Sequence, residues 1–126
     1  MITEDYVSFE TAKLLKEKGF DESTSMVYMS YGDLCKLSRY DSIRNSNYND
    51  ITKNYFEYTA PTIQMAMKWL REMHGLFIRI TEDMAGNVFE WSVYKKNYGC
   101  KASTYVEDSY EQACETAIKY CLENLI

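Results

Sequence analysis

The fold is decided by the stretch LFIRITEDMAGNVFEWSVYK, residues 76–95. Apolar and polar residues alternate along residues 76–81 and again along residues 88–95, as in strands that bury one face. Residues 84–87 (MAGN) separate these runs with turn-forming residue types. The inward face of the predicted hairpin consists of Leu76, Ile78, Ile80, Phe89, Trp91 and Val93. Such a hairpin predicts an antiparallel sheet with helices on its apolar face.

Three predicted helices surround this hairpin in the sequence, and each has recognisable ends. The first is predicted between the N-cap Ser8 and Gly19, which can take the left-handed conformation that stops a helix. The second is predicted to have Pro61 at its first position and to close at Gly75. The third begins after the N-cap Ser109 and presents a broad apolar face toward the C-terminus.

The remaining strands are predicted on either side of the second helix. Residues 26–31 and 34–40 form another hairpin around Gly32-Asp33, and residues 101–106 add an edge strand. Residues 41–59 show no sustained period and are predicted to form a long loop, a feature that tends to be functional or mobile. The expected fold is α+β, an antiparallel sheet of four to five strands with three helices mainly on one face, in the order α-β-β-α-β-β-(β)-α.

Length and composition indicate a single domain. The chain has 126 residues, of which 46% are hydrophobic and 26% charged, so residues 1–126 are expected to form one globular α+β domain. The runs KLLKE (residues 13–17) and KWLRE (residues 68–72) are similar. Either an α-β-β unit is duplicated, or the two helices share the same ending chemistry.

The chain is expected to be cytoplasmic and free of membrane segments. Its apolar stretches are far shorter than the roughly 20 residues that span a bilayer, and its acidic N-terminus does not resemble a signal peptide. In a reducing compartment the cysteines are expected to be free thiols that serve as buried small hydrophobes. Their spacing does not indicate a metal site, and no metal is expected. The cysteines are Cys35, Cys100, Cys114 and Cys121.

The charge pattern disfavours general nucleic-acid binding. The net charge is −5, and both the N-terminal and the C-terminal segments are acidic, whereas phosphate neutralisation needs a dense basic surface. One weakly basic segment, residues 36–56, contains Lys36, Arg39, Arg44 and Lys53 against Asp41 and Asp50.

No catalytic constellation is apparent, and therefore neither an enzyme nor a cofactor is expected. The single histidine, His74, lies in the last turn of the second helix, where a cation favours the helix dipole, and capping is the preferred interpretation. The acidic pairs Glu111–Glu115 and Glu82–Asp83 are interpreted as solvated faces rather than as a metal or acid–base site.

A resemblance is carried by the three helical segments. They read DYVSFETAKLLKEKGFD (residues 5–21), APTIQMAMKWLRE (residues 60–72), and SYEQACE with IKYCLENLI (residues 109–115 and 118–126). Together they resemble a family of small uncharacterised proteins from gut-bacterial genomes and their prophages and phages. The resemblance implies a cytoplasmic, phage-associated origin. It implies no activity and no catalytic residue.

Aromatic residues supply the candidate binding surface. Twelve of the residues are tyrosines, whose rings bury apolar area while the hydroxyl stays in water. Aromatic residues are concentrated between positions 48 and 58 and are flanked by two basic side chains. In one interpretation their rings stack on a base, a sugar or the side chains of a partner. In the other, they cover the open end of the sheet. The predicted surface consists of Arg44, Tyr48, Lys53, Tyr55, Phe56 and Tyr58.

A second surface is predicted on the helix-free face of the sheet. Tyr28, Phe77 and Tyr94 are expected to point away from the helices, so this face is semi-apolar and suited to a homodimer.

The leading functional hypothesis is accordingly a non-enzymatic binding module for a protein partner or for a second copy of itself. Two alternatives remain open. One is an acidic phage accessory protein that inhibits a host nucleic-acid enzyme. The other is a weak single-stranded nucleic-acid binder that uses residues 41–59.

Overall fold

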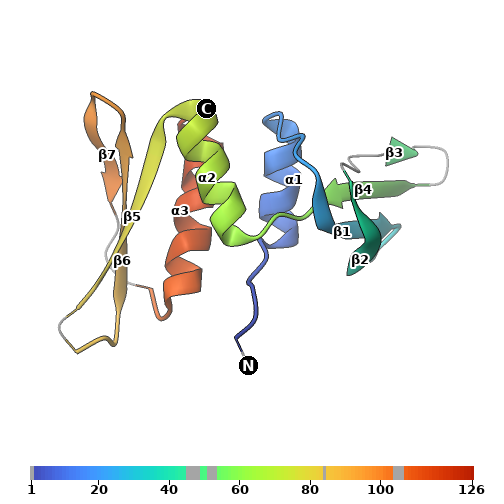
Figure 1. The fold of residues 1–126 in the computed structure, drawn as a ribbon, viewed down its shortest axis with the longest axis horizontal. Helices are drawn as coiled ribbons and strands as arrows, with labels where there is room; N and C mark the ends of the chain where they lie inside the picture. The colour runs from blue at the N-terminus through green and yellow to red at the C-terminus, as the bar shows by residue number, and fades with distance from the viewer. Residues whose placement is uncertain (1, 45–48, 51–53, 84, 104–106) are drawn as a thin grey trace. The chain divides into compact units, whose positions relative to one another are not determined.

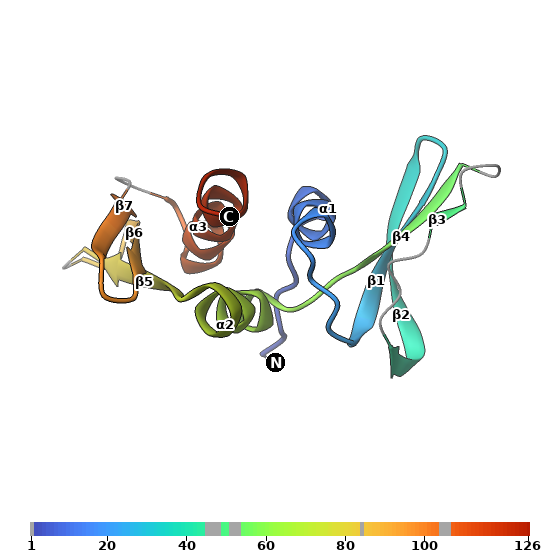
Figure 2. The same cartoon turned by 90° about the horizontal axis from the view of Figure 1, so that it is seen from above.

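The computed structural model describes residues 2–44, 49–50, 54–83, 85–103 and 107–126 of the chain (Figures 1 and 2). The fold is α+β, as predicted, with three helices and antiparallel sheets. The chain divides into a first unit, Tyr6–Thr62, and a second unit, Ile63–Ile126 with Met1–Asp5. The prediction of one domain over residues 1–126 stays a prediction.

The first unit consists of one helix and a sheet. Helix α1 spans Phe9–Glu17. The strands are β1 (Thr24–Tyr31), β2 (Leu34–Arg44), the two-residue β3 (Asn49–Asp50) and β4 (Tyr55–Thr59). Their order in the sheet is β2-β1-β4-β3, and every neighbouring pair is antiparallel. Strand β1 is therefore central, although it comes first in the sequence.

Both ends of α1 form as the sequence predicts. The hydroxyl of Ser8 accepts a hydrogen bond of 3.2 Å from the backbone N–H of Thr11, which satisfies one of the donors left free at a helix start. Gly19 has φ +92°, and the N–H of the following Phe20 donates to the carbonyl of Leu15 over 2.9 Å. Phe20 is buried, so the end of the helix is fixed by its backbone and by packing.

The second unit places a three-stranded sheet beside two helices. Helix α2 spans Ile63–His74 and α3 spans Tyr110–Asn124. The strands β5 (Leu76–Glu82), β6 (Phe89–Lys95) and β7 (Gly99–Ser103) form an antiparallel sheet in the order β5-β6-β7. The two helices contact each other and lie on the same side of this sheet (Figures 1 and 2).

The predicted hairpin of residues 76–95 is confirmed, with both faces as assigned. Ile78 pairs with Val93 and Ile80 pairs with Trp91, so these four side chains share the inward face. Trp91 and Val93 are buried, and the Trp91 ring lies 5.3 Å from that of Tyr120 on α3. On the opposite face Phe77 pairs with Tyr94, as expected of side chains that point away from the helices.

The prediction of one sheet of four to five strands is wrong, because the described residues form two separate sheets. The first hairpin does not pair with the second. Its strand β1 pairs instead with β4, for example Val27 with Thr59. Strand β4 lies within residues 41–59, which were predicted to be a loop. The first unit thus completes its own sheet without the hairpin of residues 76–95.

The start of the second helix also differs from the prediction. Helix α2 begins at Ile63, so Pro61 lies outside it rather than at its first position. The Pro61 carbonyl accepts a hydrogen bond of 3.1 Å from the N–H of Val7, and Tyr6 forms a bridge with Thr62. This pairing holds residues 61 and 62 in an extended conformation, and for this reason the helix begins only at Ile63.

Both units contain a helix followed by an antiparallel hairpin, but the first strand of that hairpin has a different place in each sheet. In the first unit the strand that follows the helix, β1, is central, whereas in the second unit the corresponding strand, β5, lies at the sheet edge. Both interpretations of the similarity between residues 13–17 and 68–72, duplication and shared helix-ending chemistry, stay predictions. Strand β7 begins at Gly99, two residues before the predicted edge strand, and residues 104–106 of that prediction lie outside the described residues.

The cysteines are free thiols, as predicted, but only two of them are buried. Cys114 and Cys121 lie on the inner face of α3 with no exposed area. Cys35 and Cys100 are exposed, because each lies near the start of a strand at a sheet edge. The prediction of burial is therefore wrong for these two.

None of the helices in the described part of the chain is both long enough and apolar enough to cross a membrane.

Candidate binding pocket

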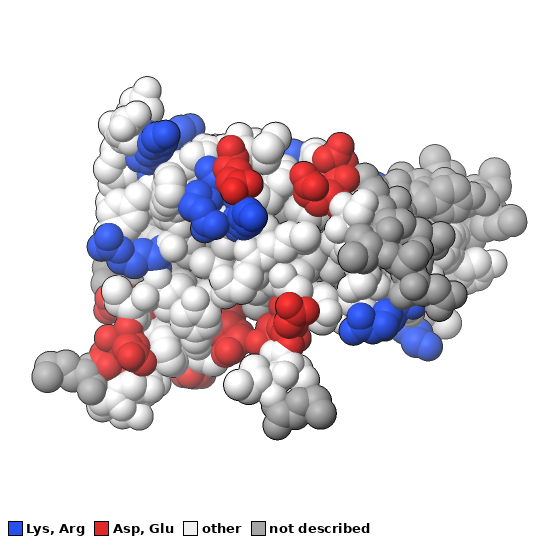
Figure 3. Space-filling model, viewed as in Figure 1, with Lys and Arg blue, Asp and Glu red and all other residues white. Residues whose placement is uncertain are grey.

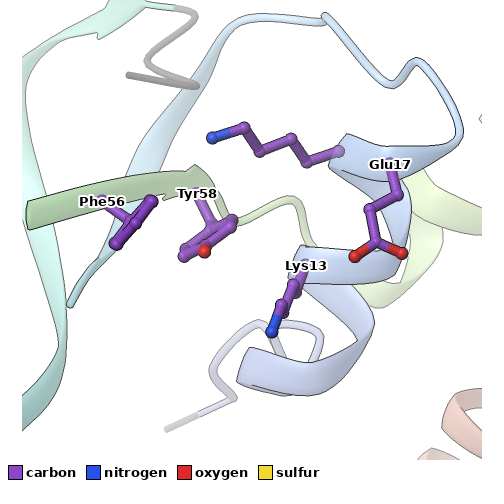
Figure 4. A pocket seen from close by; sticks show the side chains of 5 residues that line it. Lys13, Glu17, Phe56 and Tyr58 are labelled. Atoms are coloured by element: carbon purple, nitrogen blue, oxygen red, sulfur yellow. The ribbon is translucent and has the colours of Figure 1, made fainter. Parts of the chain in front are cut away.

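Two of the six predicted contact residues, Phe56 and Tyr58, line a pocket in the first unit (Figure 4). The pocket has a volume of about 280 Å³. Its other lining residues all come from helix α1 and are Lys13, Lys16 and Glu17. The pocket thus lies where α1 packs beside β4, two elements that are in contact within this unit.

The alternation of strand β4 decides which predicted residues reach the pocket. Phe56 and Tyr58 are two residues apart and share one face of the sheet. Tyr55 lies on the other face, where its hydroxyl donates a hydrogen bond of 2.6 Å to Oε1 of Glu57. Its ring also lies 6.0 Å from that of Tyr31. Tyr55 therefore contributes to the sheet and not to the pocket.

The other three predicted contact residues are not seen at the pocket. Arg44 is described in its backbone alone, as the last residue of β2 paired with Thr24. Tyr48 and Lys53 lie outside the described residues. The alternative interpretation, in which the rings cover the open end of a sheet, does not fit Tyr55, Phe56 and Tyr58, because all three belong to strand β4 itself.

The floor of the pocket consists of two nearly parallel rings. The planes of Phe56 and Tyr58 differ by 17°, and their centroids are 6.3 Å apart. Figure 4 shows these rings side by side along β4, facing the side chains of α1. Phe56 is half-buried and Tyr58 is 8% exposed.

The position of Tyr58 is fixed by further rings. Phe9 of α1 contacts Tyr28 and Tyr58 edge-on, at centroid distances of 5.7 and 5.3 Å. Tyr28 and Tyr58 are direct partners across the β1–β4 pair. The prediction that Tyr28 points away from the helices is therefore wrong, because Phe9 brings α1 onto its face of the sheet.

The electrostatics of the pocket combine two ammonium groups with one carboxylate. The Lys16 Nζ atom lies 4.7 Å from the ring centroid of Tyr58, in the arrangement of a cation–π contact. Burial lowers the pKa of Lys16. The pKa of the Tyr58 phenol is raised by burial first, then by the charges of Glu17 and Cys35, so this hydroxyl stays neutral near pH 7.

Sequence reasoning missed the helical half of the pocket. Lys13, Lys16 and Glu17 are spaced three and four residues apart and hence share one side of α1. That spacing is visible in the sequence, but it is also the ordinary pattern of a solvated helix face. Only the packing of α1 beside β4 gives these charges an aromatic neighbour.

The pocket lining combines aromatic rings with ammonium groups. Flat rings stack on aromatic side chains, and ammonium groups pair with carboxylate or phosphate oxygens. Elsewhere in the described part of the chain, no cluster of three or more histidine, cysteine or acidic side chains is arranged to hold a metal ion.

His74 lies in the last turn of α2, as predicted. Its ring contacts Trp69 edge-on at a centroid distance of 4.8 Å. Burial lowers the pKa of His74, and the nearby charge of Lys95 lowers it further. The ring is therefore neutral at pH 7 and does not supply the positive charge that capping of the helix dipole requires.

One member of each predicted acidic pair has a role at the end of an element. Glu111 is exposed in the first turn of α3, where negative charge is stabilised. Oδ1 of Asp83 accepts hydrogen bonds from the backbone N–H groups of Asn87 and Val88, over 2.7 and 3.2 Å, and so closes the turn between β5 and β6.

The geometry of the pocket is thus the main observation that bears on function. No protein-family model, no curated protein and no solved structure matches the chain.

Proposed function

We propose that this chain is a non-enzymatic binding module whose recognition site is the pocket between α1 and β4. As part of the same proposal, the protein acts in the cytoplasm and is associated with a phage or prophage. The last point is supported by the resemblance of the three helical segments. The single observation that carries the proposal is the juxtaposition of Lys13 and Lys16 with the paired rings of Phe56 and Tyr58.

The lining groups support recognition rather than turnover. Phe56 offers a half-buried apolar ring, and the lysines supply charge beside it. Both aromatic side chains are held by the sheet, and Tyr58 is further fixed by Phe9. A pre-formed surface of this kind loses little conformational entropy on binding.

The proposal is tested by titrating the isotope-labelled full chain with small aromatic anions and following its amide NMR signals. Benzoate, phosphotyrosine and adenosine monophosphate (AMP) are suitable probes. We expect at least one of them to shift the signals of residues 13–17 and 56–58 while the signals of α3 stay unchanged. A Phe56→Leu variant should lose the response. If none of the three probes shifts the pocket signals, the proposal fails.

The non-enzymatic part of the proposal has its own test. A probe that binds is incubated with the full chain for many hours and is then analysed by chromatography. We expect the probe to be recovered unchanged. Conversion that increases with protein concentration, and is lost in the Phe56→Leu variant, would contradict this part.

A second candidate function follows from the uneven charge. The second unit has eleven acidic side chains and seven basic ones, whereas the first has eight and seven. In Figure 3 several acidic side chains lie in the lower left part of the view, and others lie beside basic side chains in its upper part. These carboxylates support the alternative proposal of a phage accessory protein that occupies the phosphate-binding surface of a host nucleic-acid enzyme. Competition with DNA that persists after Glu111→Gln and Glu123→Gln would exclude it.

Self-association is proposed through the helix-free face of the second sheet. Phe77 on this face is 40% exposed, and Tyr94 beside it lies under the guanidinium of Arg79, whose Cζ atom is 5.0 Å from the ring centroid. Light scattering coupled to size exclusion tests this proposal. We expect a dimer that Phe77→Ser converts to a monomer, and a monomeric wild type would refute it.

A further inference from the structure

We infer that two copies of the chain associate through strand β5, which pairs antiparallel with β5 of the second copy and joins the two β5-β6-β7 sheets into one. This inference rests on the proposed self-association and specifies its geometry, because Phe77 on the helix-free face then meets the second copy at the sheet edge. Four features of β5 carry it, namely its backbone edge, its burial, the charges at its ends and the order of its side chains.

The outer edge of β5 offers backbone groups to a further strand. Among the residues that the structure describes, β5 pairs with β6 alone. Hydrogen bonds from the N–H of Lys96 to the Gly75 carbonyl (2.9 Å) and from the N–H of Asp83 to the Val88 carbonyl (3.1 Å) flank this ladder. Since alternate residues of an antiparallel pair exchange hydrogen bonds, the odd-numbered residues of β5 bond β6 and the even-numbered ones turn their N–H and C=O groups outward. Such a row is a template for another strand.

Strand β5 is also incompletely buried on both of its faces. On the inward face Ile78 and Ile80 are half-buried, whereas Trp91 and Val93, their partners on the central strand β6, are buried. On the helix-free face Phe77 is 40% exposed. A strand added beside β5 would cover apolar area on both faces, which favours pairing.

The charges at the two ends of β5 favour an antiparallel partner. Lys95 pairs with Leu76 at the beginning of the strand, and Lys96 follows it. At the other end Glu82 is the last residue of β5 and Asp83 comes next, and both are exposed. A parallel partner would bring like charges together. An antiparallel partner brings the acidic end of one copy toward the basic end of the other.

The order of the side chains selects one register about a two-fold axis. An axis at Arg79 would place the two guanidinium groups directly opposite each other, which is destabilising. An axis at Ile80 would place Glu82 opposite Ile78 on the apolar inward face. An axis at Ile78 places Phe77 of each copy opposite Arg79 of the other and pairs Ile78 with its own copy. The last register is therefore the one that we infer.

The contact between Phe77 and Arg79 of the second copy has a precedent within the chain. The Arg79 Cζ atom lies 5.0 Å from the ring centroid of Tyr94, and Phe77 is the direct cross-strand partner of Tyr94. A guanidinium group is planar and stacks on aromatic rings. The exposed Arg79 can therefore receive Phe77 of the second copy on the face turned away from Tyr94. Two-fold symmetry makes this contact twice.

Amide exchange tests the backbone pairing. The full chain is studied at low and high concentration by light scattering and by hydrogen–deuterium exchange NMR. We expect a dimer at high concentration, in which exchange of the Ile78 and Ile80 amides slows about tenfold or more relative to the monomer. The amides of Phe77 and Arg79, which bond β6, should be protected at both concentrations. A dimer whose Ile78 and Ile80 amides exchange as they do in the monomer would overturn the inference.

A swap of two side chains tests the register. Phe77→Arg places a guanidinium group opposite Arg79 of the second copy and should weaken the dimer about tenfold. Phe77→Arg/Arg79→Phe restores the contact with its members reversed and should recover most of the lost affinity. Tyr98→Arg is the matched control, because it adds the same charge in place of an aromatic side chain that is 70% exposed outside β5. Thermal unfolding verifies that each variant is folded. A double variant that dimerises no better than Phe77→Arg would refute this register.

The outcomes separate this inference from the proposed self-association. If the chain dimerises, Phe77→Ser abolishes the dimer and the edge amides exchange rapidly, then self-association through the helix-free face stands and edge pairing fails. A chain that is monomeric at every concentration refutes both, and would indicate a strand of another protein as the occupant of the edge.

Discussion

The phenol oxygen of Tyr28 donates a hydrogen bond of 2.6 Å to the backbone carbonyl of Val7. It ties the central strand of the first sheet to the residue that precedes the N-cap of α1. Val7 itself has no exposed area, so its carbonyl has little access to water once the phenol is removed. The ring of Tyr28 also contacts Phe9. Tyr28 therefore holds the start of α1 through a hydrogen bond and packs against the first turn of this helix.

We predict that Tyr28→Phe lowers the free energy of unfolding by about 1 kcal/mol, because the Val7 carbonyl loses its partner while the ring contacts remain. Denaturation with urea measures the change. Tyr31→Phe is the control, since Tyr31 is 58% exposed and phenylalanine keeps its ring. Equal stability of Tyr28→Phe and wild type would show that this hydrogen bond contributes nothing.

The sharp change of direction between α2 and β5 depends on Gly75, which has φ +66°. A Cβ atom at this position would meet the Lys96 Cβ at an ordinary distance of 3.7 Å, so strain in the backbone is the dominant cost. We predict that Gly75→Ala destabilises the protein by about 1–2 kcal/mol. Gly75→Asn should cost less, because asparagine tolerates the left-handed region. If both variants cost the same, strain is not the cause.

The folded protein should lose stability when His74 becomes protonated. Its pKa is lowered by burial and by Lys95, so the unfolded chain binds this proton more readily than the folded chain does. Stability should therefore be complete above the ordinary pKa of 6.5 and fall as the pH drops from there through the lowered pKa. His74→Gln should flatten this part of the pH profile of the unfolding free energy.

His74 is the single histidine, so other side chains with ordinary pKa values contribute little in that range. A profile that keeps its slope in His74→Gln would show that another group is responsible. The variant also loses the contact with Trp69, and for this reason the slope rather than the absolute stability is the relevant measurement.

The thiols should fall into two reactive classes. Burial raises the pKa of Cys114 to about 11 and that of Cys121 to about 12, and both are without exposed area. We predict that an aromatic disulfide reagent at pH 8 labels Cys35 and Cys100 rapidly and the two α3 thiols only on unfolding. Cys35→Ser/Cys100→Ser should remove the rapid phase entirely. A rapid phase that persists in this variant would place a reactive thiol on α3.

The helix ends were predictable from the sequence because their chemistry is local. Ser8 and Ser109 each accept a hydrogen bond from the backbone N–H three residues on, and Gly19 takes a positive φ directly after the helix. The hairpin of residues 76–95 was predictable for a similar reason. Its two strands are adjacent in sequence, and their alternation defines a single buried face.

Strand β4 was not predictable in this way, because its partner is distant. Val27 pairs with Thr59, and nothing between them marks the pairing. Phe56 and Tyr58 occupy one side, while Glu57 and Thr59, both buried, occupy the other. This alternation covers only four residues, and burial of polar side chains on the second side is not expected from hydropathy.

The pocket was therefore only half predictable. The aromatic half was found from residue type, since tyrosine and phenylalanine are concentrated near position 56. The charged half on α1 was missed, because Lys13 and Lys16 gain their aromatic neighbours only when β4 pairs with β1 and receives the helix. Tyr55 was predicted to belong to the same surface as Phe56 and Tyr58 because it is close to them in sequence. In the structure it lies on the opposite face of the strand, where it bonds Glu57.

The strand arrangement determines which contacts can form at each stage of synthesis. The pairs of the β1–β2 and β1–β4 ladders join residues between Thr24 and Thr59, and α1 precedes them, so a ribosome has synthesised every residue of these elements before it reaches α2. Residues 2–5 behave differently. The Asp5 carbonyl accepts a hydrogen bond of 2.9 Å from the N–H of Ile63, which is added much later. The residues that are synthesised first can therefore be anchored only after every residue of the first sheet has been added.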